Sequence, residues 1–261
     1  MKHLWRSVIF LDLDNTILHG PFESAVFPTV FREIAEKSGL DVAGIRGRVL
    51  EENRRRQETP AIPAVQAMDW GDILATVAEA LGVQLTADVQ QIVDAHAGPP
   101  HAAALDDAAT VLRQLARPDR ALVVATNGLR KYQQPVLDAL GLTRLFTEIL
   151  TPDTHNALKQ DAAFYGDWPR VTQIQVSVGD RYDDDVLAPK SFGFRSIWKP
   201  GAPLGELSAL EPWARPERFA YQEGQTIRPD AIIASLAELP AVIEQLEPFA
   251  TSRSTRGSAG G

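Results

Sequence analysis

The chain contains no cysteine and no long hydrophobic run. The absence of cysteine excludes disulfides, thiolate catalysis and cysteine-ligated metals. No stretch approaches the roughly 20 apolar residues that a membrane-spanning helix needs. The apolar run near the N-terminus stops at Asp12, too soon for a signal peptide. We therefore expect a cytoplasmic protein without a membrane partner.

Positive charge is also scarce: 26 Lys and Arg stand against 34 Asp and Glu, which gives a net charge of -8. A broad nucleic-acid-binding surface is therefore not expected, although a local basic site for an anionic ligand is compatible with this balance. The other proportions, 44% apolar and 23% charged, are those of an ordinary globular protein. A length of 261 residues allows one large domain or two smaller ones.

One stretch near the start, residues 8–16, joins a short apolar run directly to two carboxylates. The run from Val8 to Leu11 is too short for a helix and is typical of a strand buried on both faces. Side chains alternate along a strand, so Asp12 and Asp14 project to one side of its carboxyl end, where parallel sheets bind ligands. Neighbouring carboxylates repel unless a proton or a cation such as Mg²⁺ intervenes. Taken alone, the pattern fits an acidic turn equally well.

Residues 17–103 are predicted to be helical, without a strand. We expect helices at 27–37, 41–58, 69–81 and 86–96, the last with Thr86 as its N-cap. Arg54, Arg55 and Arg56 form a basic run that either meets an anionic substrate or, as is more common, covers a solvated helix face. This block has the pattern of a helical subdomain inserted between strands.

From residue 106 onward, helices and apolar strands alternate. Strands are expected at 121–125, 146–150, 174–178, 195–198 and 231–233, and helices at 106–116, 132–140 and 236–246. This alternation predicts an α/β protein with a parallel sheet flanked by helices. In the proline-rich residues 199–229, Trp213, Phe219 or Tyr221 is expected to pack near the helical block or in a subunit contact. A surface excursion without a function explains this stretch equally well. The Ser/Gly/Arg-rich tail at 251–261 is predicted to be disordered.

Polar groups follow three of the predicted strands. They are Asp12 and Asp14 after the first, Thr126-Asn127-Gly128 after the second, and Gly179 through Asp185 after the third, with Lys159 between the last two groups. Parallel strands end at one edge of a sheet, so these groups can converge there. Each group alone has an ordinary interpretation, as a turn, a solvated acidic loop or a surface lysine, but their order and strand context favour a site.

In this order the groups resemble the four motifs of the haloacid dehalogenase (HAD) superfamily of phosphohydrolases. The matching residues are Asp12-Leu-Asp14-Asn-Thr16, Thr126-Asn127, Lys159 and Gly179-Asp180 through Asp185. The resemblance covers nearly the whole chain, including residues 229–240, which are similar to the usual end of these proteins. Two positions depart from the pattern: Gln160 replaces a proline, and Ala188-Pro189 replaces Gly-Ala.

The resemblance implies a Rossmann-like core made of residues 1–16 and 104–250. It also implies that residues 17–103 form a helical cap of the C1 type, a mobile lid over the site. Candidate substrate contacts in or near this cap are His19, Glu23, Arg46 and Arg48. His19 is equally well explained as a loop residue.

The resemblance further assigns roles to the motif residues. Asp12 is the nucleophile that forms an aspartyl phosphate, and Asp14 protonates the leaving oxygen and then activates water. The expected Mg²⁺ ligands are an Asp12 oxygen, the backbone carbonyl of Asp14, and Asp180. Thr126 and Lys159 complete the catalytic set: Thr126, Asn127 and Lys159 bind the phosphate, and Lys159 also offsets negative charge and holds Asp12 in place. Asp184 and Asp185 support the metal or its waters.

The implied function is Mg²⁺-dependent hydrolysis of a small phosphorylated metabolite by a monomer or homodimer. Haloacid dehalogenases of this superfamily lack the second aspartate and need no metal, so Asp14 favours phosphoryl transfer. Two alternatives stay open: a phosphomutase or other phosphotransferase, and a catalytically silent binding protein on the same fold. The sequence does not name the substrate.

Overall fold

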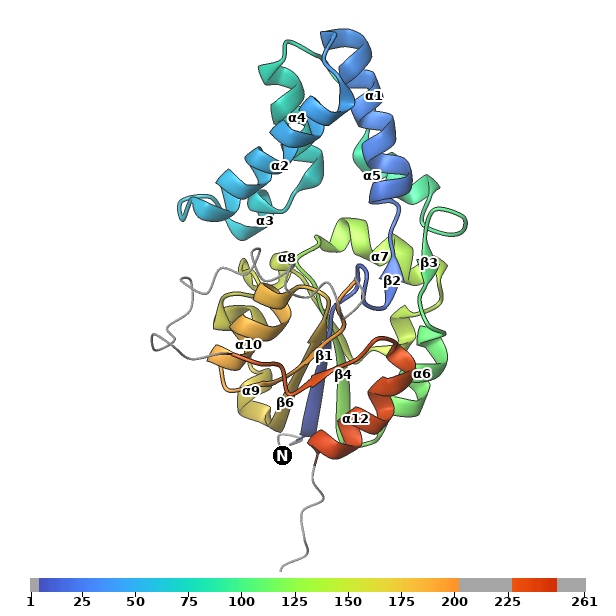
Figure 1. The fold of residues 1–261 in the computed structure, drawn as a ribbon, viewed down its shortest axis with the longest axis vertical. Helices are drawn as coiled ribbons and strands as arrows, with labels where there is room; N and C mark the ends of the chain where they lie inside the picture. Colours follow the sequence, from blue (N-terminus) through green and yellow to red (C-terminus); the bar gives the residue numbers. More distant parts are fainter. Residues whose placement is uncertain (1–4, 202–226, 248–261) are drawn as a thin grey trace, which may run out of the picture.

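The computed structural model describes residues 5–201 and 227–247. A six-stranded sheet with the order β5-β4-β1-β6-β7-β8 lies at its centre (Figure 1). Every neighbouring pair in this sheet is parallel. The strands are β1 (Trp5–Leu11), β4 (Arg120–Ala125), β5 (Glu148–Leu150), β6 (Thr172–Gly179), β7 (Arg195–Trp198) and β8 (Ala231–Ile232). The predicted Rossmann-like α/β fold is thereby confirmed.

Helices cover both faces of this sheet (Figure 1). The helices are α6 (Ala108–Leu115), α7 (Arg130–Ala139), α8 (Pro152–His155), α9 (Trp168–Val171), α10 (Ala188–Ser191) and α12 (Leu239–Leu246). Shorter turns are the 3₁₀ turns η2 (Thr143–Leu145), η3 (Ala162–Tyr165) and η8 (Leu236–Glu238), and the π-helical turn η4 (Tyr182–Leu187). None of the helices within residues 5–201 and 227–247 combines the length and apolarity that a membrane span requires.

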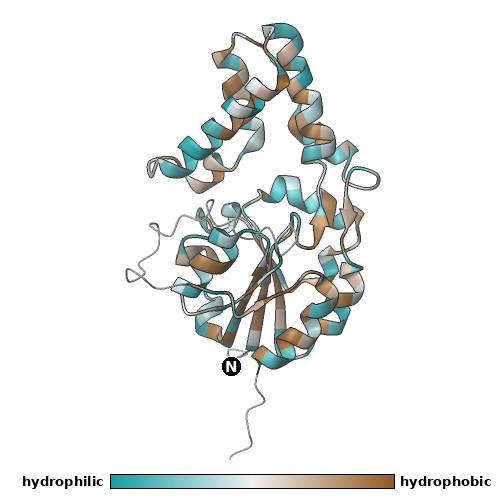
Figure 2. Cartoon of the chain, viewed as in Figure 1, coloured by the Kyte–Doolittle hydropathy of each residue, from teal (hydrophilic) through white to brown (hydrophobic). Residues whose placement is uncertain are grey.

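Strand β1 occupies the middle of the sheet because both of its faces are apolar. Ile9 and Leu11 pack into a core shared with α6, α7 and α12. Val8 and Phe10 point to the opposite face, where the ring of Phe10 lies 4.8 Å from that of Tyr165. Figure 2 shows the strands as a brown, hydrophobic centre between the helices. Burial on both faces fixes the register of β1 and hence the position of the carboxylates that follow it.

A second group of helices lies beyond the carboxyl edge of the sheet (Figure 1). It contains η1 (Phe22–Val26), α1 (Phe27–Ser38), α2 (Val42–Glu58), α3 (Ala64–Ala67), α4 (Trp70–Ala80) and α5 (Val89–Ala95). These helices bury an apolar cluster of their own, to which Leu129 and Tyr132 contribute from the start of α7. The predicted helical character holds, while the domain limits at 17 and 103 stay a prediction.

Two short strands mark the ends of this helical block. Strand β2 (Leu18–His19) pairs antiparallel with β3 (Ala103–Ala104). The prediction that residues 17–103 contain no strand is therefore wrong at both ends. A strand of two residues is too short to show the alternating pattern on which sequence-based prediction depends.

Two of the predicted helix signals, one at a C-terminus and one at an N-terminus, have different outcomes. Helix α1 ends at Gly39, whose φ of 76° is the left-handed conformation expected of a C-cap glycine. Helix α5, in contrast, begins after Asp88, whose carboxylate accepts the N–H of Gln91 at 3.0 Å. The prediction of Thr86 as N-cap is wrong, because its N–H and hydroxyl both donate to Glu33 Oε1 of α1, at 2.6 and 2.8 Å.

The contacts of Glu33 make stability pH-dependent. Burial opposes ionisation, but hydrogen bonds from Lys37, Thr86 and Ala87 outweigh it and lower the pKa of Glu33 to about 2. A carboxyl with a depressed pKa stabilises the fold above its unfolded pKa of about 4.3, and this contribution is lost as the pH falls towards the folded value. We expect Glu33→Gln to lower the free energy of unfolding at pH 7 by roughly 1–2 kcal/mol.

The difference between the wild type and Glu33→Gln should shrink as the pH is lowered from about 5 to about 2. Denaturant unfolding at several pH values measures it. Glu36→Gln, an exposed position on the same helix, serves as the control. A Glu33→Gln deficit that stays constant over this range would contradict the role given to the carboxylate.

Arg56, in the basic run of α2, neither lines the cavity where a substrate would bind nor covers a solvated helix face. This side chain is only 4% exposed and reaches Glu52 of α2 at 2.7 Å and Asp72 of α4 at 2.5 Å. It also donates to Thr76 at 2.8 Å. Arg56 thus joins α2 to α4 inside the helical block.

The predictions for Trp213, Phe219 and Tyr221, and for the tail at 251–261, concern residues outside the described ranges.

Candidate active site

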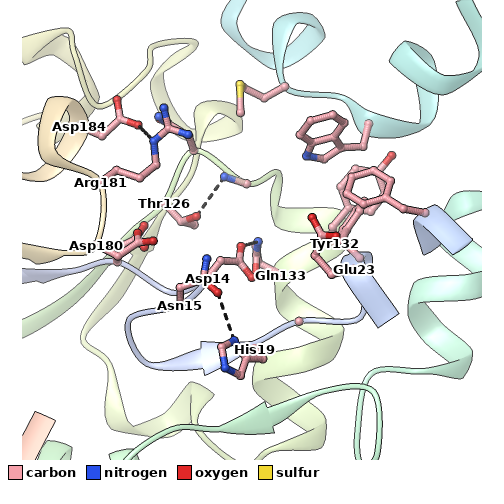
Figure 3. Close-up of a pocket in the computed structure, with 18 of the residues that line it drawn as sticks. Asp14, Asn15, His19, Glu23, Thr126, Tyr132, Gln133, Asp180, Arg181 and Asp184 are labelled. Atoms are coloured by element: carbon pink, nitrogen blue, oxygen red, sulfur yellow. Dashed lines mark hydrogen bonds and ion pairs between the residues drawn. The ribbon is translucent and has the colours of Figure 1, made fainter. Parts of the chain in front are cut away.

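The three loops that carry the motif residues meet at the carboxyl edge of the sheet. Strand β1 lies between β4 and β6, so the residues that follow these three strands are neighbours. They border a cavity of about 700 Å³, the active-site cavity, which the helical block also lines. Of the predicted site residues, those lining this cavity are Asp12, Asp14, Thr126, Asn127, Lys159, Asp180 and Asp184. Figure 3 labels four of them, Asp14, Thr126, Asp180 and Asp184.

Lys159 is the buried cation at the base of this site. Its side chain is 2% exposed, and its Nζ lies 2.7 Å from Asp12 Oδ1 and 2.6 Å from Asp185 Oδ1. Burial alone would lower the pKa of Lys159, but the charges of Asp12 and Asp185 raise it well above its ordinary value. The backbone N–H of Lys159 donates to Asn127 Oδ1 at 3.0 Å, which ties the loops after β4 and before β6 together.

Gln160, one of the two departures from the family pattern, has a contact of its own. Its side-chain amide donates to Asp184. Asp184 also forms an ion pair with Arg181, 2.7 Å from its Nε (Figure 3). Asp184 is thus held by Gln160 and Arg181.

Asp185 reaches the site through a close approach to the backbone. A Cβ added at Gly179 would lie 2.1 Å from the carboxylate carbon of Asp185, so only glycine fits there. The N–H of Arg181 donates to Asp185 Oδ2 at 3.0 Å, and the π-helical turn η4 begins at the next residue. This geometry directs the 1% exposed Asp185 under the sheet edge towards Lys159.

Three carboxylates form a cluster suited to a cation. Asp12, Asp180 and Asp185 each offer an oxygen, and these oxygens all lie within 4.8 Å of one another. Burial, followed by the charge of Asp12, raises the pKa of Asp180 to about 7. An all-oxygen set with this much mutual repulsion fits a hard divalent cation such as Mg²⁺. The cluster contains two of the predicted metal ligands, Asp12 and Asp180, together with Asp185, which was expected only to support the metal. Metal binding by the backbone carbonyl of Asp14 stays a prediction.

Asp14 lies on the cavity wall beside Asp12 and has a partner that sequence reasoning missed. Gln133 of α7 donates to Asp14 Oδ2 at 2.8 Å (Figure 3). Burial and the charge of Asp12 raise the pKa of Asp14 to about 6, against the lowering effect of this hydrogen bond. The only sequence signal for Gln133 is a polar residue on a buried helix face, where it is 5% exposed.

Gly128 leaves the space that Gln133 occupies. A Cβ added at this glycine would lie 2.2 Å from Gln133 Nε2 and 3.0 Å from its Cδ. The N–H of Gly128 donates to Thr126 Oγ1 at 3.0 Å. Because the Thr126 oxygen is the acceptor in this bond, its hydroxyl proton is available to a ligand in the cavity.

The four predicted substrate contacts divide into two pairs. His19 and Glu23 line the cavity, whereas Arg46 and Arg48 do not. Arg46 instead donates to both carboxylate oxygens of Glu23, at 3.2 and 3.3 Å. His19 Nδ1 lies 3.2 Å from Asn15 Oδ1 in the loop after β1.

Comparison with protein families agrees with this geometry. The family model for haloacid dehalogenase-like hydrolases matches residues 7–193. The chain therefore belongs to the haloacid dehalogenase-like hydrolases, which confirms the resemblance seen in the motifs. The comparison with curated proteins found no match.

Solved structures of this family share the fold. A HAD phosphatase from Thermococcus onnurineus superposes with a TM-score of 0.65 at 23% identity, over 91% of this chain and 97% of its own. A Bacillus subtilis protein described as a HAD-hydrolase, bound to magnesium, gives 0.58 at 17% identity, over 92% and 99%. L-2-haloacid dehalogenase from Xanthobacter autotrophicus, with chloropropionic acid covalently bound, gives 0.59 at 18% identity, over 92% and 99%. At these identities the likeness concerns the fold alone.

Proposed function

We propose that this hydrolase is a Mg²⁺-dependent phosphatase that cleaves a small phosphate monoester through an aspartyl phosphate on Asp12. The observation that carries the proposal is Asp14, a second carboxylate on the cavity wall with a pKa raised to about 6. A departing halide needs no proton, whereas the alkoxide that leaves a phosphate ester does. A group that can hold a proton beside the nucleophile therefore favours phosphate ester cleavage over dehalogenation.

In the first step, a carboxylate oxygen of Asp12 forms a bond to phosphorus and the ester P–O bond breaks. Asp14, in its protonated form, gives its proton to the departing oxygen. A pKa near 6 lets this group hold a proton and release it again close to neutral pH. The hydrogen bond from Gln133 fixes the direction in which the Asp14 carboxyl faces the cavity.

In the second step, the Asp14 carboxylate takes a proton from a water molecule. The water oxygen forms a bond to phosphorus, and the bond between phosphorus and Asp12 breaks. Inorganic phosphate leaves, and Asp14 is again protonated for the next cycle. One acid/base group thus serves both steps.

The surrounding residues offset the negative charge that gathers in these steps. Lys159 neutralises part of the charge on Asp12, and the Thr126 hydroxyl donates to a phosphoryl oxygen. Asp12, Asp180 and Asp185 would hold Mg²⁺, which supplies further charge neutralisation between carboxylate and phosphate. Residues 17–103 act in this proposal as a C1-type cap that keeps bulk water out of the cavity.

Release of inorganic phosphate from p-nitrophenyl phosphate in the presence of Mg²⁺ tests the proposal. Halide release from 2-chloropropionate is measured in parallel. We expect phosphate and no halide. Halide release without phosphate would identify a dehalogenase, and neither product would indicate a silent binding protein. Transfer of the phosphoryl group to a sugar hydroxyl, without free phosphate, would identify a phosphotransferase.

Gln133 and Gly128 provide a test of how Asp14 is positioned. Gln133→Leu removes the hydrogen bond to Asp14, and Gly128→Ala forces the same amide away from its position. A hydrogen bond to a charged group contributes about 1.5–3 kcal/mol, so each variant should lose roughly 10- to 100-fold in kcat for an alkyl phosphate. The double variant should lose little more than either single one, because both changes remove one interaction.

Gln134→Leu is the matched control for the comparison of these single and double variants. Gln134 is the next residue of α7, and its amide donates to Asp138 and Thr143, away from the cavity. Its rate should match the wild type. If the loss in kcat of the double variant equals the product of the two single losses, the two substitutions act independently. That result would contradict the contact between Gly128 and Gln133.

A further inference from the structure

The wall of the active-site cavity opposite the carboxylates is aromatic. Phe22, Phe27, Trp70 and Tyr132 line it, together with Met68. The rings of Phe22 and Tyr132 lie 5.3 Å apart at 81°, and those of Phe27 and Trp70 also 5.3 Å apart at 81°. Figure 3 shows Tyr132 across the cavity from Asp180 and Thr126. Phe22, Phe27 and Trp70 are half-buried, so these rings keep surface open to the cavity.

Residues 17–103, all of which are described, contribute no Lys or Arg side chain to this cavity that could meet a second anionic group. The titratable side chains that they contribute are the carboxylate of Glu23 and the imidazoles of His19 and His101. Lys159 and Arg181 come from the sheet edge, where both are already paired with carboxylates. A carboxylate or second phosphate on the substrate would lie against this aromatic wall with no Lys or Arg side chain to meet it, at a desolvation cost.

Free hydrogen-bonding groups accompany the aromatic rings. The indole N–H groups of Trp168 and Trp198 donate to Glu148 and to the Asp180 carbonyl, whereas that of Trp70 has no acceptor among the described residues. The Gln57 amide donates to Asn53 Oδ1 at 2.7 Å, and its own carbonyl oxygen has no donor in this part of the chain. Trp70 and Gln57 both line the cavity, so its wall contains one donor and one acceptor without a partner among the described residues.

The size of the cavity fits a substrate larger than a phosphorylated two- or three-carbon acid. At about 30 Å³ per water, a volume of about 700 Å³ has room for roughly 23 water-sized groups. A phosphoryl group at Asp12 uses only a small part of this space. The remainder extends to the aromatic wall.

We propose that the alcohol part of the substrate carries a flat, uncharged or cationic ring, as in a nucleoside monophosphate, and no second acid group. The ring stacks against the aromatic wall while its phosphate lies at Asp12. This inference rests on the proposed phosphatase function and adds the chemical class of its substrate. Stacking on aromatic side chains depends on the π-face of the ring, so several different rings are accommodated.

Three alkyl phosphates of similar leaving-group chemistry test this substrate class: uridine 5′-monophosphate, glycerol 1-phosphate and 2-phosphoglycolate. We expect kcat/KM to be about 10-fold or more higher for the nucleotide than for glycerol phosphate, because base stacking contributes a factor of this order. Phosphoglycolate should be the poorest. Equal values, or a preference for phosphoglycolate, would overturn the substrate class while leaving the phosphatase proposal intact. No phosphate from any of the three, nor from p-nitrophenyl phosphate, would overturn both.

Substitution of Trp70 tests whether the aromatic wall causes the preference for the nucleotide over glycerol phosphate. Trp70→Leu should lower the advantage of the nucleotide over glycerol phosphate by about 5- to 100-fold, chiefly through KM, and Trp70→Phe should retain much of it. Trp168→Leu, remote from the cavity beside Trp5, is the matched control and should leave the ratio unchanged. Because the measured quantity is a ratio on one protein preparation, partial misfolding does not alter it. An unchanged ratio in Trp70→Leu would contradict the proposal.

Discussion

Removal of divalent cations is expected to abolish phosphate release by this chain, and added Mg²⁺ is expected to restore it. Oxygens of Asp12, Asp180 and Asp185 lie within 4.8 Å of one another, and the pKa of Asp180 is raised to about 7 by burial and by Asp12. Without a divalent cation, Lys159 alone faces three carboxylates, and the remaining negative charge repels a phosphate dianion. Because a metal contributes several kcal/mol of charge stabilisation, the rate should fall by about 10³-fold or more.

Asp180→Ala should reproduce much of this loss without chelator. Asp183→Asn is the matched control: Asp183 lies on the same acidic turn but outside the three-carboxylate cluster. Its Mg²⁺ dependence should follow that of the wild type. Phosphate release by the wild type at an undiminished rate in excess chelator would rule out the proposed role of the metal.

The two aspartates after β1 are expected to fail in different ways. Asp12→Asn keeps the shape of the side chain but removes the nucleophile, so turnover should cease altogether. Asp14→Asn keeps the nucleophile and removes the acid/base group, so kcat for an alkyl phosphate should fall by about 10²- to 10⁴-fold. For p-nitrophenyl phosphate, whose leaving group needs little protonation, the first step in Asp14→Asn should be less impaired than with the alkyl ester.

The release of p-nitrophenol in a rapid-mixing experiment distinguishes these defects. Asp14→Asn should give a burst of about one equivalent followed by slow turnover, because its second step lacks a base to activate water. Asp12→Asn should give no burst. A burst from Asp12→Asn and none from Asp14→Asn would exchange the two roles.

The parts of the fold that the sequence predicted are those specified by local patterns. Strand β1 follows from a short apolar run, and α1 ends at Gly39 because a left-handed residue there favours glycine. The parallel sheet follows from the alternation of strands with helices. The convergence of Asp12, Thr126 and Asp180 follows from the rule that parallel strands present their carboxyl ends at one edge.

The features that sequence reasoning missed depend on contacts between distant segments. Thr86 has the chemistry of an N-cap, but Glu33 of another helix takes its hydrogen bonds. Gln133 lies 119 positions from Asp14, and no local pattern joins them. Arg56 is buried by partners on α4, which the periodicity of α2 alone does not reveal. In each case a tertiary contact decides what the side chain does.

The most direct test of the central claim, a covalent phosphate on Asp12, is a single-turnover experiment with substrate labelled in its phosphoryl group. After rapid acid quenching, we expect label on the wild-type protein briefly, label that persists on Asp14→Asn, and none on Asp12→Asn. Mass spectrometry of the labelled protein should locate the phosphoryl group on the peptide that contains Asp12. Rapid phosphate release by the wild type, with no label on it or on Asp14→Asn at any time, would contradict the claim.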